Sequence, residues 1–289
     1  QIMSIKDKAE IEEIVKSLER RNALLYHACQ LKDFRSYIHL GGIPSRNKLL
    51  NSKLDFTVFD TDKVDKENDV WDKVFGNFSD FGREFTKETS NSQPNPYGPI
   101  QIVFKPNALR STFDLSISLR SAGARDFDRN KESIKNSQEF NMIFQYIDPE
   151  QAPGASQKKN IAFANELNAR FNRNNCFSPE FNCATVNEIL SFDDAIYIVV
   201  DACQYKGQDL FDEINALTNK KVFARDYLCQ KKKAIITELS MLSATRNCTK
   251  QALLSGDFAS EKLKEWVRAR NDFHYDRFIT YLTNGTTRA

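Results

Sequence analysis

The sequence predicts an α+β fold that ends in a C-terminal α-helical extension. Segments that run apolar or alternate between apolar and polar residues, as strands do, recur up to residue 225. From Lys232 onward the apolar residues instead keep helical spacing to the end of the chain. A chain of 289 residues is long enough for one main domain with additions.

The order of the elements follows from the same patterns. Helical spacing predicts a first helix that ends near Arg21 and a second over residues 31–40, which the stop signal Gly41-Gly42 closes. Further helices are expected at residues 161–170 and 210–217. Strands are expected at residues 24–28, 100–104, 115–119, 195–201 and 221–225.

Three stretches have weak periodicity and are expected to be irregular. The first covers residues 51–98, with a short helix around 70–75, and the second is a surface loop at 148–160. The third, residues 171–187, is expected to be the loop that delivers Glu188 to the edge of a sheet. We therefore divide the chain into an N-terminal helix (1–22), a main domain (23–230) and a helical extension packed on it (231–289).

The composition is that of a soluble globular protein, with 28% charged and 40% hydrophobic residues and a net charge of +2. Six widely spread cysteines without a CxxC pair and only three histidines favour reduced cytosolic thiols over a disulfide framework or a metal site. The apolar runs are short and the N-terminus is charged, so we expect a cytoplasmic protein that does not bind membranes. No GxGxxG motif, P-loop or nucleophile elbow is present.

Several short motifs, in their order and spacing, carry a resemblance to a known family. The motifs are Leu25-Tyr26-His27-Ala28, Gly41-Gly42-Ile43-Pro44-Ser45-Arg46-Asn47, Tyr97-Gly98-Pro99-Ile100-Gln101-Ile102-Val103-Phe104-Lys105-Pro106, Val186-Asn187-Glu188-Ile189-Leu190 and Lys221-Val222-Phe223-Ala224-Arg225-Asp226-Tyr227-Leu228. Through these motifs, residues 23–229 resemble the DarT-type DNA ADP-ribosyltransferases, toxins that attach ADP-ribose to bases in single-stranded DNA.

The resemblance implies a split mixed β-sheet of the ADP-ribosyltransferase type, with NAD as co-substrate in a cleft between its halves and no metal. It implies that Glu188 is catalytic and that His27 contacts the ribose of NAD. Arg46 is the candidate for the pyrophosphate and for catalysis, because a guanidinium offers a planar fork to phosphate oxygens. The residues expected to bind NAD are Tyr26, His27, Ala28, Arg46 and Asn47.

The acceptor is expected to contact the loop ahead of Glu188. Residues 171–177 place Arg173 and amides between aromatic rings, a composition that suits stacking of unpaired bases and contact with phosphates. The alternative is that the Phe residues of this segment only anchor the loop to the core. The residues expected to bind substrate are Tyr97, Arg120, Arg173 and Phe177.

As a member of this family the chain would act on single-stranded DNA as a monomer and would be encoded with an antitoxin, an ADP-ribosyl glycohydrolase that removes the modification. Departures from the family in residues 51–98 and 119–127 favour guanine over thymine as the acceptor base. Two alternatives stay open. The chain is an ADP-ribosyltransferase that acts on RNA or protein, or it is a nucleic-acid-binding module in which Glu188 has no chemical role.

Overall fold

The structure is a computed structural model that describes residues 4–58, 62–80, 98, 100–124, 126–170, 177–201, 204–205 and 208–225. The helices are α1 (Lys8–Arg20), α2 (Leu31–Leu40), α3 (Arg46–Asn51), α4 (Asp62–Glu67), α6 (Arg129–Glu132), α7 (Ser137–Met142), α8 (Ile161–Ala169) and α9 (Leu210–Leu217). Short 3-10 helices lie at η1 (Pro106–Ser111), η2 (Pro149–Gln151), η3 (Pro153–Ala155) and η4 (Phe192–Asp194). The extension expected at 231–289 lies outside the described residues.

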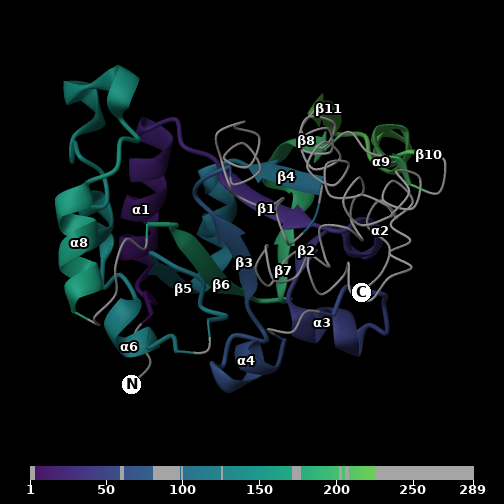
Figure 1. Ribbon diagram of the computed structural model, residues 1–289, viewed down its shortest axis with the longest axis horizontal. Helices are drawn as coiled ribbons and strands as arrows, with labels where there is room; N and C mark the ends of the chain where they lie inside the picture. The colour runs from purple at the N-terminus through teal and green to yellow at the C-terminus, as the bar shows by residue number, and fades with distance from the viewer. Residues whose placement is uncertain are drawn as a thin grey trace, which may run out of the picture. The chain divides into compact units, whose positions relative to one another are not determined.

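Seven of the strands form one mixed sheet (Figure 1). They are β1 (Leu25–Cys29), β3 (Val74–Asn77), β4 (Ile100–Phe104), β5 (Thr112–Ser118), β6 (Glu180–Thr185), β8 (Ala195–Asp201) and β11 (Lys221–Arg225), in the order β11-β8-β4-β1-β3-β6-β5. Strands β8 and β11 are parallel, whereas the pairs β1–β3, β3–β6 and β5–β6 are antiparallel. The predicted α+β class and the mixed sheet are confirmed.

Two small sheets complete the description. Strand β2 (Gly42–Pro44) pairs antiparallel with β7 (Ile189–Ser191), and β9 (Gln204–Tyr205) pairs with β10 (Gln208–Asp209). The chain divides into two compact units, one of residues 1–27, 36–79 and 103–196 and one of residues 28–35, 80–102 and 197–289. The boundaries expected at 22/23 and 230/231 stay predictions.

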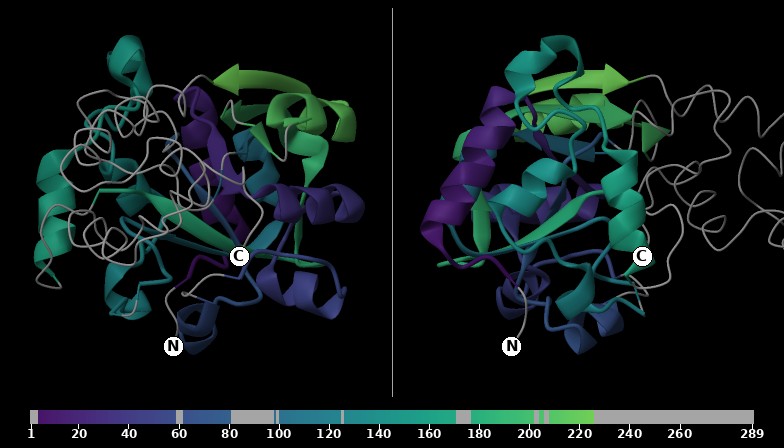
Figure 2. Two further views of the ribbon diagram at one scale, coloured as in Figure 1. Left: turned by 45° about the vertical axis from the view of Figure 1, so that its right-hand side comes forward. Right: turned by 90° about the vertical axis from the view of Figure 1, so that its left-hand side faces the viewer.

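The first unit is built on the antiparallel part of the sheet, and α1 and α8 lie on the same side of β5 and β6 (Figures 1 and 2). Asp7 caps α1 by accepting a hydrogen bond from the Ala9 amide (2.8 Å), and the helix buries Ile14 and Leu18, so the predicted first helix is confirmed. The core continues through Phe78, whose ring centroid lies 5.6 Å from that of Phe140 and 5.3 Å from that of Phe181.

The expected loop over residues 171–187 is wrong where β6 forms, because β6 is the strand between β3 and β5. The polar composition of this strand is explained by buried partners on one of its faces. Asn182 accepts a hydrogen bond from Arg129 (3.3 Å), and Glu180 accepts one from the Ala122 amide (2.9 Å). Burial raises the pKa of Glu180 to about 7.

The helix expected around residues 70–75 is also wrong. Val70 to Lys73 form a turn in which the Lys73 amide bonds the Val70 carbonyl (3.0 Å), and β3 begins at Val74. Pairing with β6 decides this segment, since Val74 faces Cys183 in the sheet. The other helices and strands predicted for residues up to 225 are present within two or three residues of their expected bounds, and residues 148–160 are the expected irregular segment.

In the second unit, β8 and β11 pair in parallel and α9 lies between them in sequence and packs on β11. An ion pair joins Arg35 to Glu213. Gly98 has a φ of +137°, and a Cβ atom there would lie 2.1 Å from the carbonyl oxygen of Cys29. Only glycine fits this approach, which explains the Gly of the motif that begins Tyr97-Gly98-Pro99.

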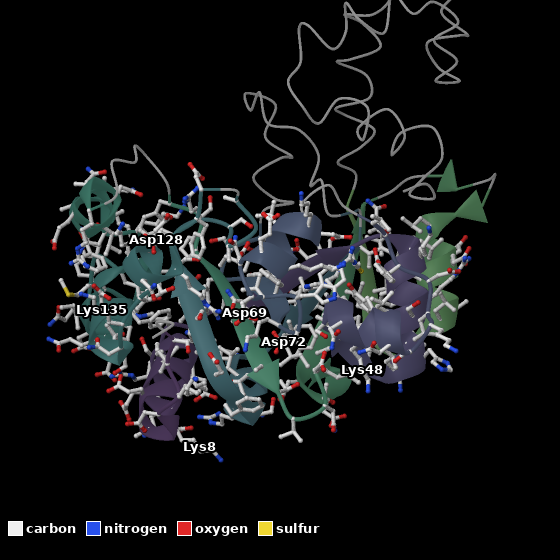
Figure 3. All side chains as sticks on the ribbon, turned by 90° about the horizontal axis from the view of Figure 1, so that it is seen from below. Lys8, Lys48, Asp69, Asp72, Asp128 and Lys135 are labelled. Atoms are coloured by element: carbon white, nitrogen blue, oxygen red, sulfur yellow. The ribbon has the colours of Figure 1, made fainter. Side chains whose placement is uncertain are left out.

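Charges of both signs are spread over the surface, among them the exposed Lys8, Asp72 and Lys135 (Figure 3). In the part of the chain that the structure describes, no helix has the length and apolar character needed to span a bilayer. Nor do the described residues include a group of three or more His, Cys, Asp or Glu side chains arranged for a metal ion. Cys29 and Cys183 are buried free thiols.

The β2–β7 pair leaves no room for a side chain at Gly42. A Cβ atom there would lie 2.3 Å from the Leu190 carbonyl oxygen and 2.7 Å from Cγ2 of Ile189. We expect Gly42→Ala to lower the free energy of unfolding by about 1–3 kcal/mol through overpacking. Thermal unfolding measures this, with Gly154→Ala as the control because a Cβ at Gly154 meets nothing within 4 Å. Equal melting temperatures for the two variants would contradict the close approach.

Candidate functional site

Glu188 stands in the turn that joins β6 to β7, with a φ of +55°. This left-handed conformation is rare for a residue with a side chain and costs about 1–3 kcal/mol unless the surroundings enforce it. The Glu188 amide bonds the Thr185 carbonyl (3.1 Å), and the Thr185 hydroxyl accepts from the Ile189 amide (2.8 Å). The Glu188 carbonyl accepts a third bond, from the amide of Ser45 (2.8 Å).

The Glu188 carboxylate is half-buried and held by two side chains that flank Arg46 in sequence. The Ser45 hydroxyl donates to Oε2 (2.5 Å), and the amide nitrogen of Asn47 donates to Oε1 and Oε2, both at 3.1 Å. The Ser45 oxygen also caps α3 by accepting from the Lys48 amide (2.9 Å). One buried hydroxyl therefore fixes both the start of a helix and the candidate catalytic acid.

Arg46 points to acidic partners rather than into open solvent. Its Nη2 donates to the carboxylate of Asp62 (3.2 and 3.3 Å) and to the carbonyl of Thr57, and its guanidinium lies 4.8 Å from the ring centroid of Phe56. A second acid, Asp65, is close by. Burial first and the charge of Asp62 second raise the pKa of Asp65 to about 6, against the opposing effect of Arg46.

His27, on β1, is a neutral imidazole. Burial first, and the positive charge of Arg46 to a lesser extent, lower its pKa to about 4 against the hydrogen bond with the Phe75 carbonyl, which raises the pKa. Its Nδ1 lies 2.7 Å from the carbonyl oxygen of Phe75, which only accepts, so Nδ1 carries the proton. Its Nε2 then accepts from the Tyr37 hydroxyl (3.2 Å). Arg46 is thus near enough to His27 to affect this pKa, and Arg46 directly follows Ser45, which bonds Glu188.

The other predicted residues lie in different places. Tyr26 faces Asn77 of β3 in the sheet, and Ala28 follows His27 on β1. Arg120 donates to Glu132 and Asp126 just after β5, and Phe177 lies just before β6. Ser118 pairs with Glu180 at the start of β6, and Thr112 pairs with Thr185 at its end. Arg120 and Phe177 therefore lie at the end of β6 opposite to Glu188. Tyr97 and Arg173 lie outside the described residues.

Three residues that contact the candidate residues were not expected from the sequence: Ser45, Tyr37 and Asp62. Ser45 has the only local signal, since a serine just before a helix is a typical N-cap. Its second bond, to Glu188, joins residues 143 positions apart in the chain. The expectation that Asn47 binds NAD stays a prediction, and its side-chain amide bonds both carboxylate oxygens of Glu188.

Solved structures similar to this chain include three complexes of one protein. No protein-family model matches the chain, and no curated protein matches it. The DarT of Thermus sp. 2.9 in complex with ADP-ribosylated single-stranded DNA is similar at a TM-score of 0.40 and 10% identity, over 70% of this chain and 93% of that one. Its complexes with NAD+ and carba-NAD+ have TM-scores of 0.37 and 0.36, identities of 11% and 10%, and cover 94% and 95% of those chains and 70% of this one.

The depressed pKa of His27 makes stability depend on pH. In the unfolded chain His27 gains a proton as the pH falls below its ordinary pKa of 6.5, whereas in the folded chain it gains one only near pH 4. The stabilisation is therefore complete above pH 6.5 and is lost as the pH falls toward 4. We expect His27→Gln to lower the melting temperature at pH 7.5 and to flatten its fall between pH 6.5 and 4. His39→Gln, at an exposed histidine, is the control; the same slope in both variants would contradict the assignment.

Proposed function

We propose that the chain is an NAD-dependent ADP-ribosyltransferase that modifies a nucleobase in single-stranded DNA. The observation that carries the proposal is the held carboxylate of Glu188. A carboxylate has about four lone-pair sites, and the bonds from Ser45 and Asn47 use three of them. Glu188 is thus oriented in advance and keeps the capacity to accept one more proton or hydroxyl donor.

One oriented carboxylate is sufficient for the chemistry of this transfer. The bond between nicotinamide and C1 of the ribose breaks, and neutral nicotinamide leaves with the electron pair. The ribose then carries positive charge, as in a glycosidase transition state. Glu188 stabilises this charge by its own negative charge. A base nitrogen forms the new bond to C1, and its proton goes to Glu188.

The electrostatics around Glu188 fit this step. A protonated histidine would repel the positive ribose, and the half-buried His27 stays neutral above about pH 4. We infer that Tyr26, His27 and Ala28 on β1 line the nicotinamide ribose side of the NAD site. Arg46 reaches the pyrophosphate by exchanging Asp62 for phosphate oxygens, and Asn47, the other residue expected to bind NAD, also positions Glu188.

The acceptor assignment is a further part of the proposal. We infer single-stranded DNA, with guanine favoured over thymine, and residues Tyr97, Arg120, Arg173 and Phe177 as candidates for its contacts. An enzyme of this kind is toxic to its own cell, so an ADP-ribosyl glycohydrolase is the expected partner. The rival functions are transfer to RNA or protein, and nucleic-acid binding without chemistry.

The decisive experiment is mass spectrometry of products from NAD incubated with the full chain and separate pools of single-stranded DNA, RNA and protein. We expect ADP-ribose on a DNA base. Glu188→Gln should lower the rate of transfer by about 100-fold to 10,000-fold, because glutamine cannot act as the general base. ADP-ribose on RNA or protein instead would show that the acceptor is not DNA. Transfer by Glu188→Gln at the normal rate would overturn the mechanism.

Asn47 offers a second test, because its amide nitrogen lies 3.1 Å from both carboxylate oxygens of Glu188. We expect Asn47→Ala to lower kcat by about 100-fold, since a small misplacement of a reacting group costs about that much. Asn187→Ala is the matched control, because Asn187 is the exposed neighbour of Glu188 in the same turn. Initial rates at saturating NAD measure both, and equal rates would contradict the positioning role of Asn47.

A further inference from the structure

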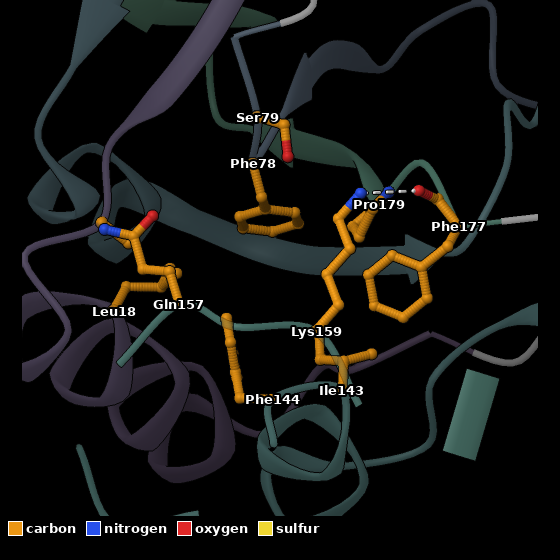
Figure 4. A pocket seen from close by; sticks show the side chains of 10 residues that line it. Leu18, Phe78, Ser79, Ile143, Phe144, Gln157, Lys159, Phe177 and Pro179 are labelled. Atoms are coloured by element: carbon orange, nitrogen blue, oxygen red, sulfur yellow. Dashed lines mark hydrogen bonds between the residues drawn. The ribbon is translucent and has the colours of Figure 1, made fainter. Parts of the chain in front are cut away.

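A pocket lined by aromatic rings lies in the first unit, outside the residues that surround Glu188 (Figure 4). Its walls include Phe78, Phe144 and Phe177, and Gln157 and Lys159 stand at its side. The pocket is small, with a cavity volume of about 50 Å³, and it is partly open to solvent. Aromatic walls with a few polar groups are the usual lining of a site for a flat organic ligand.

The pocket lies at one end of β6 and Glu188 at the other. Phe177 and Pro179 precede β6, and Glu188 follows it. A strand of this length spans about 20 Å at the usual rise per residue. The pocket is therefore a separate place on the same unit, and a ligand that reaches both must be extended.

The walls of the pocket are fixed by backbone hydrogen bonds. The Gln145 amide bonds the Lys158 carbonyl (2.7 Å), and the Asn160 amide bonds the Ile143 carbonyl (2.9 Å), so the backbone at Lys159 is pinned. On the facing wall the Ser178 amide bonds the Leu119 carbonyl (2.8 Å). The pocket is thus formed in advance of any ligand.

A buried arginine supports the same wall from behind. The guanidinium of Arg21 donates to the carbonyl oxygens of Tyr146 (2.7 Å), Ser156 (2.7 Å) and Ile147 (2.6 Å). Its Cζ lies 4.0 Å from the ring centroid of Phe144. Arg21 is fully buried, so it holds the loop and does not meet a ligand.

The exposed cation at this pocket is Lys159. Its Nζ lies 4.9 Å from the ring centroid of Phe177 and donates to the Phe177 carbonyl (3.3 Å). Gln157 beside it is also exposed, whereas Phe78 and Phe177 are half-buried. A ring that enters the pocket would stack on phenylalanine, and an anion attached to that ring would meet Lys159. A planar base joined to a phosphate has both features.

We propose that this pocket binds a nucleobase of single-stranded DNA, with the adjoining phosphate on Lys159, at a distance from the base that reacts at Glu188. The inference rests on the proposed function in its choice of DNA as the ligand. It concerns binding alone, so it is tested without NAD. The strand would be held at two points, and its affinity would depend on its length.

The experiment measures binding of fluorescent single-stranded oligonucleotides to the full chain by anisotropy. Phe177→Leu should weaken binding about fivefold or more, because stacking of one base on an aromatic ring contributes at least that factor. Lys159→Gln should reduce the slope of log K against log salt by about 0.7, the value for one phosphate contact on a single strand. Both effects should be present with oligonucleotides of about 12 nucleotides.

Matched controls come from a second Lys–Phe pair in the protein. Nζ of Lys221 lies 4.7 Å from the ring centroid of Phe223 on exposed β11, nearly the distance of the Lys159–Phe177 pair. Lys221→Gln and Phe223→Leu should bind DNA as the unchanged protein does. Melting temperatures of all four variants exclude unfolding as the cause of a loss.

The outcomes separate this proposal from the proposed function. If the unchanged chain transfers ADP-ribose to DNA but the pocket variants bind DNA like their controls, the pocket proposal is overturned and the function stands. If no transfer occurs but DNA binding still falls with Phe177→Leu and Lys159→Gln, the pocket proposal stands. Equal losses in the variants and the controls, or preferred binding of an aromatic acidic peptide, would overturn it.

Discussion

The turn at Glu188 is the constraint on which the candidate site depends. A positive φ at a glutamate is unfavourable by itself, and it persists because neighbouring contacts hold the residue from both sides. Pairing of β2 with β7 fixes the chain after the turn, and the Ser45 amide and hydroxyl bond the carbonyl and the carboxylate of Glu188. Such short strands are not stable alone. Their position relies on β6 before the turn and on the capped helix α3 beside it.

The charged groups of the candidate site are bonded to other side chains of the protein. The positive Arg46 is bonded to Asp62, the negative Glu188 accepts bonds from Ser45 and Asn47, and His27 is neutral. A ligand with a pyrophosphate must therefore compete with a carboxylate for the guanidinium. This competition lowers the affinity for the ligand. The ion pair of Arg46 with Asp62 also keeps the guanidinium from being a buried charge without a partner while the ligand is absent. In the proposed mechanism this exchange is the step that distinguishes the free protein from its NAD complex.

Strand β6 connects two places with different chemistry. Its C-terminal end leads into the Glu188 turn, where polar groups converge on one carboxylate. Its N-terminal end adjoins the pocket of phenylalanine rings and Lys159. Pairing with β3 on one side and β5 on the other makes this strand rigid. A single-stranded nucleic acid that lay along the unit would meet an aromatic anchor at one end and a reactive acid at the other, which is the arrangement that our two proposals require together.

The sequence by itself determined the α+β class and about half of the helices and strands, among them α1, α2, α8 and α9 and the strands β1, β4, β5, β8 and β11. These follow from apolar periodicity and the Gly41-Gly42 stop, whereas Glu188 and His27 became candidates through the resemblance that short motifs carry. Only the tertiary structure decided that residues 180–185 are a strand, because the polar face of β6 is satisfied by Arg129 and the Ala122 amide, which are distant in sequence. It also decided that Asn47 and Ser45 bind Glu188. Hydrogen bonds between residues more than a hundred positions apart leave no periodic trace, and for that reason neither partnership could be predicted from the chain alone.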